Sequence, residues 1–201
     1  VNVSSNGGIL AYGSGAYIIN DGTIQIEINN AGTLTISDNA SLTNNRTGEI
    51  LISGTSNNGI QANDATLTND RGIIHVNKTA GIGLSAINNG QINNLDCGLL
   101  TTSAKIETIN NGLINNEAWF EIGDINSPHS IFADFENYGL IYDPFATLTG
   151  LAIDNFGIIV DPLPAGVTEG QPVNNALWAG NLSNNITVAT TWTKGIGGAS
   201  L

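Results

Sequence analysis

The feature of this chain that most constrains its fold is a short phrase that recurs seven times. The phrase consists of an apolar residue, any residue, Asn or once Asp, a short gap that usually ends in Gly, and then alternating apolar positions. The copies begin at Ile19, Leu42, Leu67, Ile92, Ile114, Phe135 and Ile153. Self-similarity at a period of this kind is the signature of a solenoid, in which each repeat buries its apolar face by stacking on its neighbours.

The third position of the phrase predicts a ladder of side chains. This position holds Asp21, Asn44, Asn69, Asn94, Asn116, Asn137 and Asn155. Asn suits a stacked corner because its amide both donates and accepts hydrogen bonds, and because it tolerates left-handed backbone angles. We therefore expect these side chains to lie above one another and to bond along the stack. The alternative is that each Asn-Gly pair marks an isolated hairpin turn, but hairpins would not hold Asn at one place in a long period.

The residues after each corner alternate in the manner of a strand. Pairs such as Ile24 and Ile26 are β-branched and two residues apart, which favours strand over helix. Further polar corners, such as Ile87-Asn88-Asn89-Gly90 and Ile109-Asn110-Asn111-Gly112, divide each period into about three short strands. The sequence thus predicts an all-β fold, a right-handed parallel β-helix (β-solenoid) of about seven rungs. The handedness follows the general preference of parallel crossovers.

The recurrence predicts two parts of the chain. The solenoid is expected over residues 1–161, and residues 162–201 are expected to form a non-repetitive linker and a cap or intermodule joint. Asp161-Pro162 marks the end of a strand, since Pro cannot donate to a ladder. Open ends of a solenoid need covering, which a tail can do. The chain begins in mid-pattern at Val1, so we expect it to be a segment of a longer protein.

Composition excludes several classes of partner. The formal net charge is -12 with only five Lys and Arg residues, which argues against binding to nucleic acid or to anionic membranes. No apolar run of eighteen residues occurs, so we expect no membrane insertion. An acidic, Lys-poor chain rich in Asn, Thr and Gly is common among secreted bacterial surface proteins. We therefore predict an extracellular or cell-surface location.

Alternation also separates outward from inward positions on the strand that follows each corner. The outward residues are polar in the first copies, as at Thr23 and Gln25, and become apolar toward the C-terminal copies. A contiguous exposed apolar patch marks a contact site. The predicted interface consists of Ile73, Leu99, Trp119, Leu140, Tyr142, Ile158 and Val160. We expect a second chain to pack on this face; the alternative is that the tail folds over it, and a register error of one residue would swap the faces.

Chemistry-bearing residues do not cluster in the sequence. Arg46 and Arg71, with Asp70 beside the latter, are interpreted as solvated turn charges and not as the base of a lyase. The carboxylates scatter, whereas glycoside hydrolysis uses a pair at a fixed separation. His75 and His129 lack partners at zinc-ligand spacing. We therefore predict no catalytic residue, no cofactor and no metal, and expect that the protein is not an enzyme.

The single cysteine, Cys97, excludes an internal disulfide. It sits in the fourth corner beside Gly98, and we interpret it as a small buried thiol, with a linking or reactive thiol as the alternative.

The Asn-Asn-Gly-x-Ile phrases at residues 88–92 and 110–114 resemble those of large secreted bacterial β-solenoid surface proteins and adhesins. The resemblance covers residues 1–161 and implies an exported, modular chain that forms stalks, fibres or filaments or attaches to cells. The predicted function is a structural segment of such a protein that self-associates side by side into a homo-oligomer or filament, with a cell-surface or glycan target. The alternative is a carbohydrate-binding or carbohydrate-active β-helix, in which Trp119, Tyr138 and Tyr142 could stack on sugars.

Overall fold

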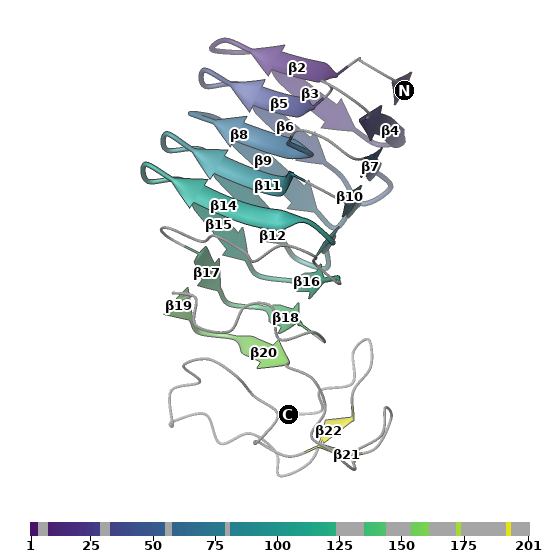
Figure 1. The fold of residues 1–201 in the computed structure, drawn as a ribbon, viewed down its shortest axis with the longest axis vertical. Helices are drawn as coiled ribbons and strands as arrows, with labels where there is room; N and C mark the ends of the chain where they lie inside the picture. Colours follow the sequence, from purple (N-terminus) through teal and green to yellow (C-terminus); the bar gives the residue numbers. More distant parts are fainter. Residues whose placement is uncertain are drawn as a thin grey trace.

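The computed structural model shows a chain wound into a β-solenoid of parallel sheets (Figure 1). The structure describes residues 1–3, 8–28, 33–54, 58–78, 81–123, 135–143, 154–160, 172–173 and 192–193. This described part contains strands and turns and no helix, as the sequence predicts.

Three parallel sheets run along the solenoid. Sheet A has eight strands, β1 (Asn2–Val3), β4 (Thr23–Ile28), β7 (Glu49–Gly54), β10 (Ile73–Lys78), β13 (Leu99–Thr102), β16 (Trp119–Ile122), β18 (Leu140–Tyr142) and β20 (Ile158–Val160). Sheet B has five, β2 (Ile9–Tyr12), β5 (Leu34–Ser37), β8 (Ile60–Asn63), β11 (Ile82–Ile87) and β14 (Lys105–Ile109). Sheet C has seven, β3 (Tyr17–Asn20), β6 (Ser41–Asn44), β9 (Thr66–Asp70), β12 (Gln91–Leu95), β15 (Leu113–Asn116), β17 (Phe135–Asn137) and β19 (Asp154–Asn155).

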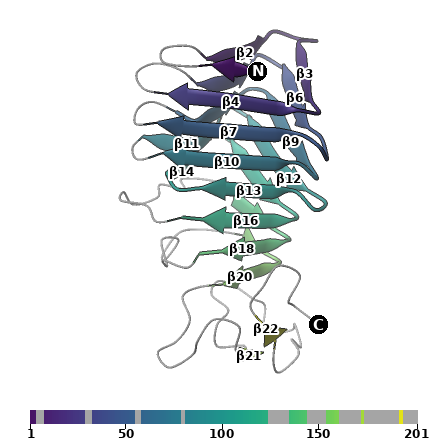
Figure 2. The same ribbon diagram turned by 90° about the vertical axis from the view of Figure 1, so that its right-hand side faces the viewer.

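Each turn of the coil passes through sheets B, C and A in that order. In five turns all three strands are described; the first of these turns is β2, β3 and β4, and the last is β14, β15 and β16. After them, β17 and β19 extend sheet C, and β18 and β20 extend sheet A. The predicted count of seven rungs is therefore approximate. Figure 2 shows sheet A facing the viewer, with its strands stacked in chain order from β4 to β20.

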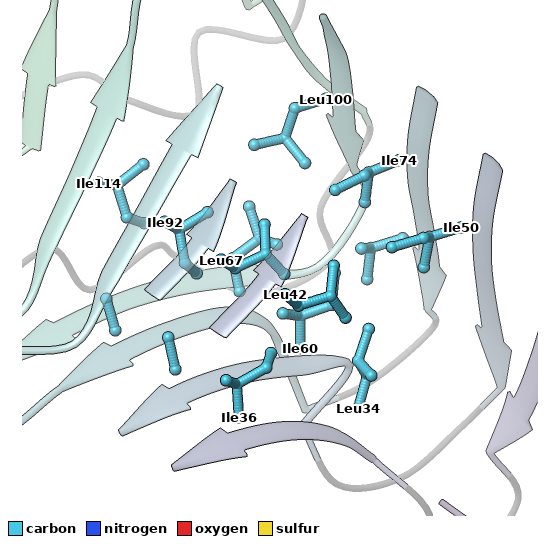
Figure 3. Packing of buried hydrophobic residues seen from close by; sticks show 14 of the residues in the cluster. Leu34, Ile36, Leu42, Ile50, Ile60, Leu67, Ile74, Ile92, Leu100 and Ile114 are labelled. Carbon is cyan, nitrogen blue, oxygen red and sulfur yellow. The ribbon is translucent and has the colours of Figure 1, made fainter. Parts of the chain in front are cut away.

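The core lies inside the coil and is made of aliphatic side chains from all three sheets (Figure 3). Equivalent positions in successive turns hold similar side chains in register. In sheet A one such file is Ile24, Ile50, Ile74, Leu100, Phe120 and Ile141, and in sheet C another is Leu42, Leu67, Ile92, Ile114 and Phe135. All are buried, and each buried aliphatic or aromatic side chain contributes about 1.5–3 kcal/mol relative to exposure.

The first copy of the phrase lies one residue earlier than predicted. In the pairing of β3 with β6, Ile18 lies beside Leu42 and Asn20 beside Asn44. The copy therefore begins at Ile18 and not at Ile19, whose side chain is 58% exposed. A slip of one residue moves every side chain of a strand to the other face, so the third position of this copy is Asn20 and the prediction of Asp21 was wrong.

Beyond the solenoid, β21 (Pro172–Val173) pairs antiparallel with β22 (Trp192–Thr193). The rest of the predicted cap or joint at 162–201 lies outside the described residues. In the part of the chain that the structure describes, no helix is long and apolar enough to cross a membrane.

Candidate functional site

The corner between sheets C and A holds a continuous ladder of buried asparagines. The Nδ2 of each side chain donates to the Oδ1 of the next, at 2.8 Å for five of the steps and 2.6 Å for the last. The members are Asn20, Asn44, Asn69, Asn94, Asn116, Asn137 and Asn155. Six of the seven predicted ladder residues are thus in the file, and Asp21 lies outside it, exposed and accepting a hydrogen bond from Asn45 Nδ2 at 2.7 Å.

Each ladder amide also ties the corner to the backbone. Asn69 Nδ2, for example, donates to the carbonyl oxygens of Gly72 at 3.1 Å and Leu99 at 3.1 Å. A Cβ at Gly98 would lie 2.5 Å from Asn94 Oδ1 and 2.8 Å from Asn69 Nδ2. At Gly98 the ladder amides therefore leave no room for a Cβ, whereas the next corner holds Ala118 at the equivalent place.

The outer face of sheet A brings most of the predicted interface residues together. Five of them follow one another in register on neighbouring strands, and we call this set the apolar file: Ile73, Leu99, Trp119, Leu140 and Ile158. Ile73 is 38% exposed, and the other four are half-buried. Toward the N-terminus the same file continues with the polar residues Glu49 and Thr23.

The other two predicted interface residues belong to a second file on this face. Tyr142 pairs with Val160, whose side chain lies outside the described residues, and on the other side with Glu121. The Tyr142 ring lies 6.5 Å from the Trp119 ring at an angle of 55°. This ring contact joins the two files near the C-terminal end of the solenoid.

A separate pair of exposed aromatic rings lies at the corner between sheets C and A. Tyr138 and Phe156 each follow a ladder asparagine, and their rings stack with centroids 4.9 Å apart. They are 51% and 60% exposed. Partial burial, followed by the charge of Glu136, raises the pKa of the Tyr138 hydroxyl. Phe156 is a surface residue that the predicted interface lacks, although its position directly after Asn155 matches that of Tyr138 after Asn137.

A groove hollows the same face over β10, β13 and β16. Its volume is about 400 Å³, and its lining includes His75, Asn77, Thr101, Ser103 and Glu121. His75, Thr101 and Glu121 lie on successive strands in register, and His75 Nδ1 is 2.8 Å from Thr101 Oγ1. In the next row, Ser103 Oγ donates to Asn77 Oδ1 at 3.2 Å. These groups converge on one concavity that sequence periodicity alone did not reveal.

Both corner arginines lie at the surface, and Arg71 is paired there with acidic side chains. Arg71 Nε donates to Asp70 Oδ1 at 2.9 Å and lies 3.9 Å from Asp96 Oδ2. The Arg71 guanidinium holds the pKa of the Asp70 carboxyl below its usual value. Arg46 is also exposed. Both arginines thus stand as solvated turn charges.

The Cys97 thiol is exposed, so the interpretation of a buried thiol was wrong. Cys97 lies in the turn between Leu95 and Gly98, where the chain passes outside the ladder and away from the core.

Within the described ranges, no three His, Cys, Asp or Glu side chains come together in a group that could hold a metal ion. His129 lies outside these ranges. Comparisons with protein-family models, with curated proteins and with solved structures find no match to this chain.

Proposed function

We propose that this chain is a rigid structural segment of an extracellular bacterial surface protein, fibre or adhesin, and that it self-associates side by side through the outer face of sheet A. The observation that carries the proposal is the apolar file with Tyr142 on the outer face of sheet A, with the exposed ring pair of Tyr138 and Phe156 at the adjoining corner. Aromatic and aliphatic side chains gathered on one face of a solenoid are typical of contact sites.

A second copy of the chain is the partner that fits this surface best. Neighbouring strands lie about 4.8 Å apart, so the side chains of a second sheet A repeat at the same spacing and can fill the gaps between those of the first. A two-fold arrangement also lays the same patch of both copies against each other. The polar end of the file, at Thr23 and Glu49, then lies outside the contact.

Rigidity is the second element of the proposed role. The Asn ladder and the stacked aliphatic files tie each rung to the next through both polar and apolar contacts. Bending the solenoid would separate buried amides from their partners, and leaving such a group unpaired costs about 1–3 kcal/mol.

The proposed role includes no catalysis, cofactor or metal. In the groove, Glu121 lies on the far side of Thr101 from His75 by register, so its carboxylate does not orient the imidazole as the acid of a triad would. Glu121 is also the single carboxylate among the described lining residues, whereas glycoside hydrolysis uses two.

The proposal is tested by measuring the oligomeric state of the full chain by sedimentation velocity over a range of concentrations. Leu140→Lys places a charge in the middle of the apolar surface, and we expect it to weaken association at least tenfold. Thr23→Lys adds the same charge at the polar end of the same register file and should leave association unchanged. Far-UV circular dichroism checks that both variants keep the wild-type fold.

A second measurement separates a partner chain from the tail as the occupant of this face. In a Cys97→Ser background, the Leu140→Cys thiol should react quickly in dilute monomer and slowly in the associated protein. A wild-type chain that stays monomeric at every concentration, or a thiol already protected in the monomer, contradicts the proposal.

A further inference from the structure

We propose that the groove over β10, β13 and β16 binds a short neutral saccharide. This site goes beyond the structural role. It lies on the same outer face of sheet A, and Leu99 belongs both to its lining and to the apolar file, so association through that face would cover the groove and the monomer is the state that binds.

The groove exists because a row of side chains is interrupted. Backbone bonding from Gly123 N to Thr102 O, at 2.8 Å, places Gly123 next to Ser103 in the row that begins with Asn77. A Cβ at Gly123 would lie 3.1 Å from Ser103 Cβ, so a larger residue there would fill this end of the groove. The volume of about 400 Å³ lies within the range of small-molecule sites.

The polar groups of the groove suit hydroxyl ligands. A sugar hydroxyl both donates and accepts, and the lining supplies both kinds of partner: hydroxyls of Thr101 and Ser103, the Asn77 amide, the His75 ring and the Glu121 carboxylate. His75 uses Nδ1 toward Thr101, which leaves Nε2 for a ligand. An ionised Glu121 only accepts hydrogen bonds, and sugar hydroxyls are donors for it.

The lining also has an apolar part. Leu99 lines the groove beside the polar row of His75, Thr101 and Glu121. A sugar ring carries C–H groups on its faces and hydroxyls around its edge. An aliphatic side chain beside a row of polar groups therefore matches both parts of such a ring.

The charge and the residue types of the lining argue against other small ligands. None of the described lining residues is Lys or Arg, and the chain has a net charge of -12, so an anionic ligand would be repelled. Among the described lining residues, His75 and Glu121 are the two that commonly ligate metal ions, and no third His, Cys, Asp or Glu of the described residues joins them in a group.

The proposal is tested by two-dimensional ¹H–¹⁵N spectra of the full chain, at a concentration at which it is monomeric, titrated with trisaccharides. The neutral probes are maltotriose, cellotriose, mannotriose and N,N′,N″-triacetylchitotriose, the anionic probe is trigalacturonic acid, and the cationic probe is the deacetylated trimer of glucosamine. We expect at least one neutral trisaccharide, at millimolar concentration, to shift the amide resonances of β10, β13 and β16 together.

Variants at the site and a matched control give the second half of the test. Gly123→Val, which fills the hollow, and Glu121→Ala, which removes an acceptor, should each weaken binding at least tenfold. Gln25→Ala is the matched control. Gln25 is an outward residue of β4 that is aligned, through Leu51 of β7, with His75, and it lies outside the groove, so its replacement should change binding less than twofold. The spectra themselves show whether each variant is folded.

Three results would overturn the proposal: no neutral probe shifts these resonances, only the charged probes do, or Gly123→Val binds as tightly as the wild-type chain. Repeating the titration with Leu140→Lys keeps this test apart from the structural role. Binding by that variant supports the site even where self-association is absent.

Discussion

Two corners of the solenoid are rich in asparagine and use it for different reasons. At the corner between sheets C and A, the ladder asparagines are buried, and each amide is bonded on both sides. At the corner between sheets B and C, Asn88, Asn89, Asn110 and Asn111 are exposed and have φ between 51° and 62°. None of the ladder asparagines is among the described residues with positive φ.

The difference separates two properties of one residue type. The buried corner needs an amide that donates and accepts, while the exposed corner needs a residue that tolerates the left-handed conformation. Side chains at the exposed corner also bond to each other, as from Asn110 Nδ2 to Asn88 Oδ1 at 3.0 Å, but in water such a bond adds little. Asn-rich repeats can therefore look alike in sequence while their corners respond to different substitutions.

The largest effect is expected from Asn69→Asp in the middle of the ladder. A carboxylate there meets Asn94 Oδ1 without a proton to donate, so the free energy of unfolding should fall by about 3–5 kcal/mol at neutral pH. Burial raises the folded-state pKa of the new carboxyl above its unfolded value. The loss of unfolding free energy is therefore largest at pH values above the folded-state pKa, and it becomes smaller as the pH falls through that pKa. Urea unfolding at about pH 7 and pH 5 measures this, and a loss that does not depend on pH would contradict the ladder chemistry.

The glycine beside the ladder gives the next effect. Gly98→Ala places a Cβ against Asn94 Oδ1 and Asn69 Nδ2, and overpacking of this kind destabilises by about 1–3 kcal/mol. Gly22→Ala is the matched control, because a Cβ there meets no atom within 4 Å. Thermal unfolding followed by circular dichroism compares the two variants. Equal changes in melting temperature would mean that close approach to the amides is not what requires glycine.

The exposed corner should give a smaller effect with a different pattern. Asn89 has φ of 62°, so Asn89→Ala should cost about 1 kcal/mol, whereas Asn89→Gly should be nearly neutral because glycine adopts this conformation freely. At the ladder, Asn69→Gly and Asn69→Ala should both be strongly destabilising. Urea unfolding of the four variants tests the comparison, and a damaging Asn89→Gly would show that this corner also depends on its amide.

The smallest effect separates the two candidates for the first ladder position. Asn20→Ala removes a buried donor and should cost about 1 kcal/mol, while Asp21→Ala changes an exposed side chain and should stay within about 0.5 kcal/mol. Differential scanning calorimetry of both variants resolves this difference. The reverse order would restore Asp21 to the ladder.

The fold could be predicted because the phrase occurs once in each rung of the solenoid. Asn at a fixed position and β-branched residues two apart specify which face of each strand is buried, and the observed register matches the prediction from β6 to β19. The first copy could not be placed, because Ile18 and Ile19 are both β-branched aliphatics and Asn20 and Asp21 both suit a corner. With two equivalent choices at each place, alternation does not distinguish the two registers.

The site was only partly accessible to sequence reasoning. The positions of the apolar file could be predicted, because outward residues alternate with the buried core residues along each strand of sheet A. The groove does not, because it depends on the absent side chain of Gly123 lying beside Ser103 and on how far each loop shifts the next strand. The exposure of Cys97 depends likewise on how far its longer corner projects beyond the ladder.

The ladder also gives the solenoid a polarity. Every step runs in the same sense, from the Nδ2 of one rung to the Oδ1 of the next. At the N-terminal end of the ladder the Oδ1 acceptor of Asn20 faces outward, and at the C-terminal end the Nδ2 donor of Asn155 does. A further rung continues the file only if it arrives in the same orientation. Units joined along this axis by the same amide pattern therefore point one way, and a thread built from them has distinguishable head and tail.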